Sequence, residues 1–306
     1  MAHPYQHGWY QIAFERDLIN EITPLSFADT PLIAVKANNQ VRIFDANCPH
    51  RGAHLGYETC LDGNVIACPF HGYRIGLGQG GGETYSVKEF QSFVMGGMVF
   101  IRLSERESPD FPLAINDLVQ DHTLVTAFEL QVEVPIEMVI ENGFDQGHFK
   151  GVHGLIEEPK LKVERGALGE LTVSGVFKIP RSSWNSYSPD NAAVITEFFG
   201  RAFSPGTIIV RLRGEEPYNY HIISSAVPLK GCQSCIVRLS LALPNKVASD
   251  TAFISALIEA SKIGLQKDLA VWNHLNLNFQ NKYSDADAPV LSFHRFCDEF
   301  KALATN

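Results

Sequence analysis

The sequence has no hydrophobic run long enough to cross a bilayer as a helix. Its longest run, FVMGGMVFI from Phe93 to Ile101, contains two glycines, whereas a spanning helix needs about 20 apolar residues. The N-terminal segment MAHPYQHGWYQIAF also lacks the basic start, apolar stretch and small-residue cleavage site of a secretory signal. We therefore expect a cytoplasmic protein with no membrane span.

Positive charge is also scarce. The chain has 25 Lys and Arg against 34 Asp and Glu, a formal net charge of -9, and no stripe rich in Lys and Arg. Such a surface repels a phosphate backbone, so nucleic acid is not an expected partner. The six cysteines of a chain that looks cytosolic are more typical of metal ligands or buried thiols than of a disulfide framework.

The sequence does contain enough apolar residues for a sizeable core, at 45% of the chain. From Trp9 to Leu103, short strand-like segments alternate with turns marked by glycine, asparagine or proline, which indicates a small all-β domain. The stretch Ser104 to Leu118 is rich in charge, proline and serine, and we interpret it as a linker. The expected domains are residues 1–110 and 119–306.

The second part of the chain has a mixed pattern. A helix is expected after Pro135, followed by strand-like segments such as LTVSGVFKI, YHIISSAV and CIVRLSLAL. A long amphipathic helix is predicted from about Thr251 to Leu275. The predicted class is therefore α+β, with an antiparallel sheet in the second domain.

Two Cys/His pairs stand seventeen residues apart in the first domain, as Cys48-x-His50 and Cys68-x2-His71. A cluster of two irons and two sulfides with two thiolate and two imidazole ligands needs this donor set. Zinc is the competing interpretation, because two Cys and two His also form structural zinc sites. The C-x-H spacing argues against zinc, whose first pair is usually spaced by two to four residues.

Both loops, C-P-H-R-G and C-P-F-H-G, closely resemble those of the Rieske family. The resemblance implies a [2Fe-2S] cluster bound by Cys48, His50, Cys68 and His71. Rieske proteins of the cytochrome bc type carry an extra disulfide at positions matching Ala53 and Phe70, and neither residue is cysteine here. The chain is therefore similar to the lower-potential oxygenase or ferredoxin type.

A second pattern, Asn142-x2-Asp145-x2-His148-x4-His153, resembles the mononuclear-iron motif of Rieske non-haem iron oxygenases. The resemblance implies that both histidines bind Fe(II). The chemistry needs two imidazoles and one carboxylate on one face of the metal, which leaves positions open for O2 and substrate.

The resemblance implies that the carboxylate comes from a helix near the C-terminus, and Asp268 lies on the apolar stripe of the long helix predicted there. A buried carboxylate there needs a partner, which a metal provides. Asp268 followed by Trp272 is similar to the 3-ketosteroid 9α-hydroxylase-like branch. Asp285 and Asp287 are the alternative ligands, in a context more typical of a turn.

The resemblance further implies a helix-grip catalytic domain, meaning an antiparallel sheet that wraps a long helix. Asp145 is expected to relay an electron by contacting a cluster histidine of a neighbouring subunit and an iron-binding histidine of its own. A homotrimer follows from that role. Electrons would come from NAD(P)H through a separate ferredoxin or ferredoxin reductase, because the sequence has no convincing flavin or nicotinamide motif. The glycines of GLGQGGG fit a dinucleotide pattern but lack its strand-turn-helix context.

The function implied is that of a terminal oxygenase that uses O2 to hydroxylate a mainly apolar small molecule, such as a steroid-like, aromatic or natural-product substrate. Desaturation, demethylation and cyclisation stay open, because the same ligands serve them. The alternative from another class is an electron-carrying Rieske protein without catalytic iron. Segments SSWNSY and AVITEFFGRAF are expected to line the pocket, and Cys232-x2-Cys235 to form a hairpin turn.

Overall fold

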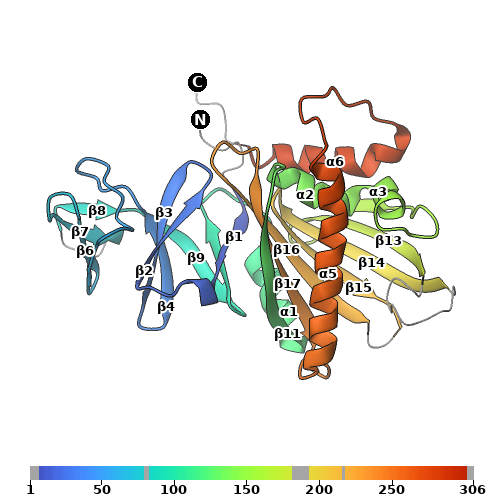
Figure 1. Cartoon of the computed structure of the whole chain (residues 1–306), viewed down its shortest axis with the longest axis horizontal. Helices are drawn as coiled ribbons and strands as arrows, with labels where there is room; N and C mark the ends of the chain where they lie inside the picture. The colour runs from blue at the N-terminus through green and yellow to red at the C-terminus, as the bar shows by residue number, and fades with distance from the viewer. Residues whose placement is uncertain (1–6, 79–82, 181–192, 216–217, 302–306) are drawn as a thin grey trace.

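The computed structural model describes residues 7–78, 83–180, 193–215 and 218–301. An N-terminal all-β part is followed by a sheet-rich part with a long C-terminal helix (Figure 1). The predicted α+β class is therefore confirmed. Within the described residues, no helix is both long and apolar enough to cross a bilayer.

The larger N-terminal sheet has six strands in the order β1-β10-β9-β4-β3-β2. All its pairings are antiparallel. Its strands are β1 (Trp9–Phe14), β2 (Ile22–Phe27), β3 (Thr30–Ala37), β4 (Gln40–Asp45), β9 (Glu89–Met95) and β10 (Met98–Arg102).

A smaller four-stranded sheet carries the two Cys/His loops at the end of the molecule remote from the second domain (Figure 1). Its strands are β5 (Leu61–Asp62), β6 (Val65–Ala67), β7 (Arg74–Leu77) and β8 (Tyr85–Val87). Their apolar side chains form a local core with Cys48 and Cys68. This core fixes the bases of both loops, while the loop tips lie outside it.

The segment that we interpreted as a linker is partly helical, which corrects that interpretation. Helix α1 (Phe111–Asp121) begins at Asp110, whose side chain accepts the backbone N–H of Leu113 at 3.1 Å. Pro112 occupies a position in its first turn, where the missing N–H costs nothing. Phe111 and Ile115 are fully buried in a cluster shared with both domains, so this segment packs into the core.

The second domain is built on a seven-stranded antiparallel sheet in the order β11-β17-β16-β15-β14-β13-β12. Its strands are β11 (His122–Val132), β12 (Lys162–Arg165), β13 (Leu171–Pro180), β14 (Ala193–Ser204), β15 (Thr207–Arg213), β16 (Asn219–Pro228) and β17 (Cys235–Pro244). The predicted turn between Cys232 and Cys235 connects β16 to β17, with Cys232 at a φ of 61°.

Helix α5 (Thr251–Trp272) crosses one face of this sheet (Figure 1). It buries Leu257, Leu265, Asp268 and Trp272, which repeat at helical spacing and so form one face. The expected helix after Pro135 is present as α2 (Ile136–Glu141), and α3 (Gln146–Gly151) and α6 (Ala288–Asp298) pack nearby. A 3-10 turn, η3 (Asn142–Phe144), joins α2 to α3.

The two domains share one hydrophobic core. A single buried cluster runs from Tyr10 in β1 to Phe144 and Phe293 in the second domain. Polar contacts reinforce the junction, because the carbonyl oxygen of Trp9 accepts the Thr207 hydroxyl at 2.8 Å and Arg238 donates to the carbonyl of Gln11 at 3.1 Å. The relative position of the domains is therefore fixed by apolar and polar contacts together.

Candidate metal centres

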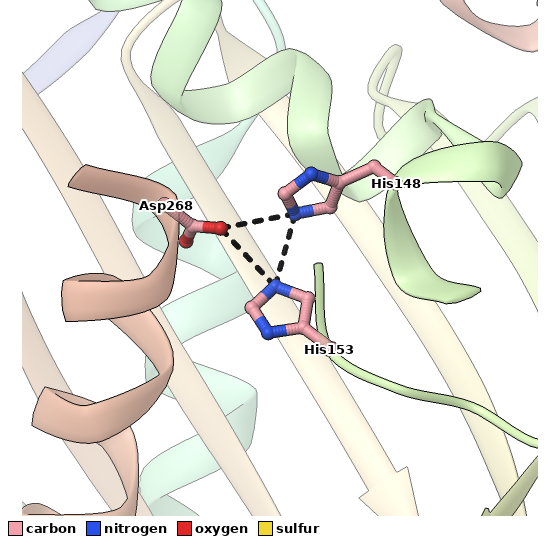
Figure 2. Close-up of side chains that lie close together, drawn as sticks. All are labelled: His148, His153 and Asp268. Carbon is pink, nitrogen blue, oxygen red and sulfur yellow. Dashed lines mark hydrogen bonds and ion pairs between the residues drawn. The ribbon is translucent and has the colours of Figure 1, made fainter. Parts of the chain in front are cut away.

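Three potential metal ligands converge between α3 and α5. His148 lies in α3, His153 follows that helix, and Asp268 projects from α5 (Figure 2). The Oδ1 atom of Asp268 is 3.1 Å from Nε2 of His148 and 3.3 Å from Nε2 of His153, and the two Nε2 atoms are 2.9 Å apart. Segments more than a hundred residues apart thus meet at one point.

The local sequence explains why His148 faces this point. Asp145 is the N-cap of α3, and its Oδ1 accepts the backbone N–H of His148 at 3.1 Å. The helix is short and ends at Gly151, after which Gly154 has a φ of 73°. The chain can therefore turn back at once and bring His153 beside His148.

The surroundings of Asp268 fit a bound cation. The residue is only 8% exposed, and none of the described groups forms a hydrogen bond of normal geometry with its Oδ1. Burial raises the pKa of this carboxyl, but the contacts with the two imidazoles lower it by more, so the pKa lies below its ordinary value. An anionic oxygen and two imidazole nitrogens aimed at one point form the facial triad of non-haem Fe(II) sites.

The alternative ligands Asp285 and Asp287 lie elsewhere. Both belong to η4 (Asp285–Asp287), and Asp287 accepts the backbone N–H of Ser284 at 2.7 Å as part of a capping box. The ligand atoms of His148, His153 and Asp268 all lie within 4.8 Å of one another. Among the described residues, this is the group of three or more His, Cys, Asp or Glu side chains that could hold a metal ion.

An aromatic layer packs beside this triad, and of its members only Phe198 was expected from the sequence, within the segment AVITEFFGRAF. The ring of Phe149 lies 5.9 Å from that of His148, 4.5 Å from that of Phe177 and 5.2 Å from that of Phe198. Phe177 and Phe198 stack at 4.6 Å on neighbouring strands β13 and β14. The available signal was their strand alternation, which places every second side chain on the interior face.

The two Cys/His loops have the same backbone design. The N–H of Cys48 donates to the carbonyl of Ala53 at 2.8 Å, and the N–H of Cys68 donates to the carbonyl of Tyr73 at 2.8 Å. Gly52 and Gly72, each four residues after its cysteine, have φ values of 72° and 71°. Glycine suits both turns, since L-residues avoid this region of backbone conformation.

The side chains of the loops meet at their tips. Cys48 and Cys68 are each 2% exposed, and the rings of His50 and His71 lie 4.8 Å apart at 76°. Nδ1 of His50 is buried with no hydrogen-bond partner in the described part of the chain, which leaves this nitrogen available to bind a metal. Burial raises the pKa of the Cys48 thiol, so forming the thiolate here requires a compensating cation such as a metal.

The donor set of these loops is compatible with a two-iron cluster. In a Rieske centre two histidines replace two cysteines on one of the two irons, so two thiolates and two imidazoles are needed. A structural zinc site can use the same donors, so the preference for a two-iron cluster rests on the C-x-H spacing of the first loop.

The two remaining predicted site residues flank the iron triad. Asn142 begins η3, and its Nδ2 is buried without a hydrogen-bond acceptor among the described groups. Asp145 follows η3 and caps α3 as described. Its expected contact with a second subunit stays a prediction, and so does the pocket role of SSWNSY, which lies outside the described residues.

Comparison with family models identifies both halves of the chain. Residues 8–91 match the Rieske [2Fe-2S] domain, and residues 104–300 match the 3-ketosteroid 9α-hydroxylase C-terminal domain. The chain belongs to the 3-ketosteroid 9α-hydroxylase-type Rieske oxygenases. The predicted family and enzyme class are therefore confirmed, and the pure electron carrier is not favoured.

Curated relatives of this oxygenase are similar along nearly its whole length. The cholesterol 7-desaturase of Drosophila melanogaster is 22% identical over 97% of this chain and 75% of the relative. The oxygenase component of the 3-ketosteroid-9-alpha-monooxygenase of Rhodococcus rhodochrous is 21% identical over 97% of this chain and 80% of its own.

Solved structures show the same fold. NdmA of Pseudomonas putida CBB5 with caffeine aligns with this oxygenase at a TM-score of 0.72 and 17% identity, over 96% of this chain and 90% of its own. The oxygenase in the reduced complex of carbazole 1,9a-dioxygenase with ferredoxin aligns at 0.73 and 16% identity, over 97% and 89%.

Proposed function

We propose that this oxygenase hydroxylates a ring-bearing, mainly apolar molecule of the steroid-like class, using O2 and electrons from a separate ferredoxin or reductase that draws on NAD(P)H. The convergence of His148, His153 and Asp268 beside an aromatic layer carries the proposal. The catalytic-domain family and the relatives named for cholesterol and 3-ketosteroids support the substrate class.

In this proposal His148, His153 and Asp268 hold Fe(II), which supplies the activation of O2 when bound. The chain contributes the surroundings. Asp145 fixes the direction of His148 through its backbone N–H, and Asp268 remains anionic because its pKa is depressed. Phe149, Phe177 and Phe198 exclude water from one side of the site and offer flat apolar surfaces to a ring system.

Cys48, His50, Cys68 and His71 would hold the [2Fe-2S] cluster, which supplies single electrons. Phe70 and Tyr73 beside it are 58% and 43% exposed, so the loop tips are open to a partner. The loops lie at the end of the first domain that is remote from the second domain, whereas the triad lies inside the second domain, at α3 and α5 (Figure 1). This separation favours electron transfer between subunits of a homotrimer. We place the protein in the cytoplasm, and we place the boundary between its two domains near residues 110–119.

Desaturation is the second candidate, because the cholesterol 7-desaturases align over 97% of this chain. The same ligands serve both outcomes, so residues alone do not separate them. Product analysis does. Hydroxylation places an oxygen atom from isotopically labelled O2 in the product, whereas desaturation removes two hydrogen atoms and adds no oxygen.

Metal counting tests the site. The wild type should hold about three irons per chain, two in the cluster and one at the triad. Asp268→Ala should hold about two, with the visible Rieske spectrum unchanged, and the matched control Asp285→Ala should keep three. Zinc in the loops, or full iron retention in Asp268→Ala, would overturn the proposal.

A further inference from the structure

A buried hydroxyl on the interior face of the catalytic sheet has no hydrogen-bond partner in the part of the chain that the structure describes. Thr196 in β14 is 0% exposed, and its Oγ1 has no hydrogen-bond partner among the described residues. Leaving such a group unpaired costs free energy, because the hydroxyl loses its hydrogen bonds to water and gains none in the protein. Buried polar atoms are rarely left so, and each exception calls for an explanation.

The position of Thr196 in the sheet relates it to the iron triad. In β14 the residues Val194, Thr196 and Phe198 are buried and alternate with exposed neighbours, so all three face inward. Thr196 stands directly opposite Phe177 in the register of β13 and β14. Since Phe177 contacts Phe149, and Phe149 lies beside His148, Thr196 is a polar group next to the aromatic layer.

The backbone of Gly214 approaches the Thr196 hydroxyl closely. Gly214 follows β15, and a Cβ added there would come within 3.3 Å of Thr196 Oγ1. Its φ lies outside the left-handed region, so backbone conformation does not require glycine at this position. The close approach to Thr196 favours glycine instead, because a side chain would press on Oγ1.

We propose that Thr196 is a substrate-positioning residue that hydrogen-bonds a hydroxyl or carbonyl oxygen on an otherwise apolar, ring-bearing substrate. The threonine hydroxyl can donate to a carbonyl and can also accept from a hydroxyl. The rings of such a molecule would lie along the aromatic layer, with the reacting carbon toward the triad. This inference rests on the proposed function and names the group by which that site orients its substrate.

The same arrangement gives selectivity. A ligand that lacks the oxygen would leave the Thr196 hydroxyl unpaired in the complex, and sites built to bind a polar group reject analogues without it. Replacing Thr196 with valine keeps the shape and removes the hydroxyl. Because it removes an unpaired buried group, Thr196→Val should fold at least as stably as the wild type.

The test compares three probes on the iron-loaded holoenzyme: cholesterol, its ketone cholestenone, and cholestane, which has no oxygen. Dissociation constants are measured by calorimetry with each probe delivered from cyclodextrin. The wild type and Thr196→Ser should bind cholesterol and cholestenone roughly three- to tenfold more tightly than cholestane. Thr196→Val should lose this preference. Thr172→Val, which removes a hydroxyl from β13 that donates to the carbonyl of Glu164 at 3.0 Å, should keep it.

The outcomes separate the two proposals. If Thr196→Val keeps the preference, or if the wild type shows none or binds no probe, the role of Thr196 is wrong whether or not the enzyme turns over. If the preference is as expected but the iron-loaded protein oxidises none of the probes with a reductase and NADH, the proposed reaction fails and the binding role stands. In an active enzyme, Thr196→Val should raise KM for cholestenone more than it lowers kcat.

Discussion

Asp145 accepts the backbone N–H of His148 at 3.1 Å and thereby caps the helix that carries this histidine. The same carboxylate is the one that family resemblance assigns to electron relay. A purely structural role needs only a hydrogen-bond acceptor, whereas the relay is expected to need the carboxylate. The two roles can therefore be separated by substitution.

Asp145→Asn should keep the cap, because asparagine is as good an N-cap as aspartate, and so should keep the mononuclear iron. Asp145→Ala should lose about 1 kcal/mol of local stability and part of that iron. Iron content and the rate of cluster oxidation in a single turnover measure these effects. If Asp145→Asn transfers electrons at the wild-type rate, the charge of Asp145 has no part in the relay.

Alanine substitutions at Gly72 and Gly264, where a Cβ would meet no neighbouring atom, should change the stability in opposite directions. Gly72 has a φ of 71° and Gly264 lies within α5, and in both cases an added Cβ meets nothing within 4 Å. Gly72→Ala should cost about 1–2 kcal/mol through backbone strain, and Gly264→Ala should gain about 1 kcal/mol from helix propensity. Urea unfolding midpoints of the holoenzyme give both signs, and a gain for Gly72→Ala would contradict the strained-turn interpretation.

Stability should depend on pH through His294 and Glu141. Nε2 of His294 lies 2.6 Å from Oε2 of Glu141, and this hydrogen bond raises the pKa of the histidine above its ordinary 6.5. A raised folded-state pKa contributes stability that is complete below the unfolded-state pKa and is lost as pH rises through the folded value. The difference in unfolding midpoint between wild type and His294→Gln should therefore be larger at acidic than at alkaline pH. A difference independent of pH would show that the charge does not matter.

Removing one partner of a buried ion pair near α1 should destabilise the protein more than removing both partners. Glu170 is 2% exposed, and its Oε1 accepts from Nη2 of Arg201 at 2.6 Å. Arg201→Met would leave a buried carboxylate without its cation, which typically costs about 3–5 kcal/mol. The double variant Glu170→Met with Arg201→Met should recover much of that loss in chemical unfolding. No recovery would mean that Arg201 acts through its packing on Phe203 instead.

Motif spacing and family resemblance predicted that His148, His153 and Asp268 would lie together, and the structure brings the three side chains to one point. Composition did not predict helix α1, because proline, aspartate and charge are typical of a linker. The same residues, with Asp110 as cap and Pro112 in the first turn, are also the start signal of a helix.

The role argued for Thr196 was beyond the reach of the sequence for a physical reason. The segment AVITEFFGRAF was expected to line the pocket, but strand alternation leaves open which of its two faces is interior. That depends on which face of the sheet packs against residues distant in sequence, such as Phe149 of α3, which contacts Phe198. Whether the Thr196 hydroxyl has a hydrogen-bond partner likewise depends on all the residues packed around it in the folded chain.

The hydrophobic core that joins Tyr10 to Phe144 and Phe293 has a consequence for how this protein can be handled. A fragment ending near residue 110 would expose the apolar side chains of β1 and its neighbours to water and would leave the carbonyl of Trp9 without its partners. Exposed patches of this kind promote aggregation. The first domain should therefore not fold as an independent unit. Exchanging it between oxygenases would also require exchanging the surface of β14 to β17 against which it packs.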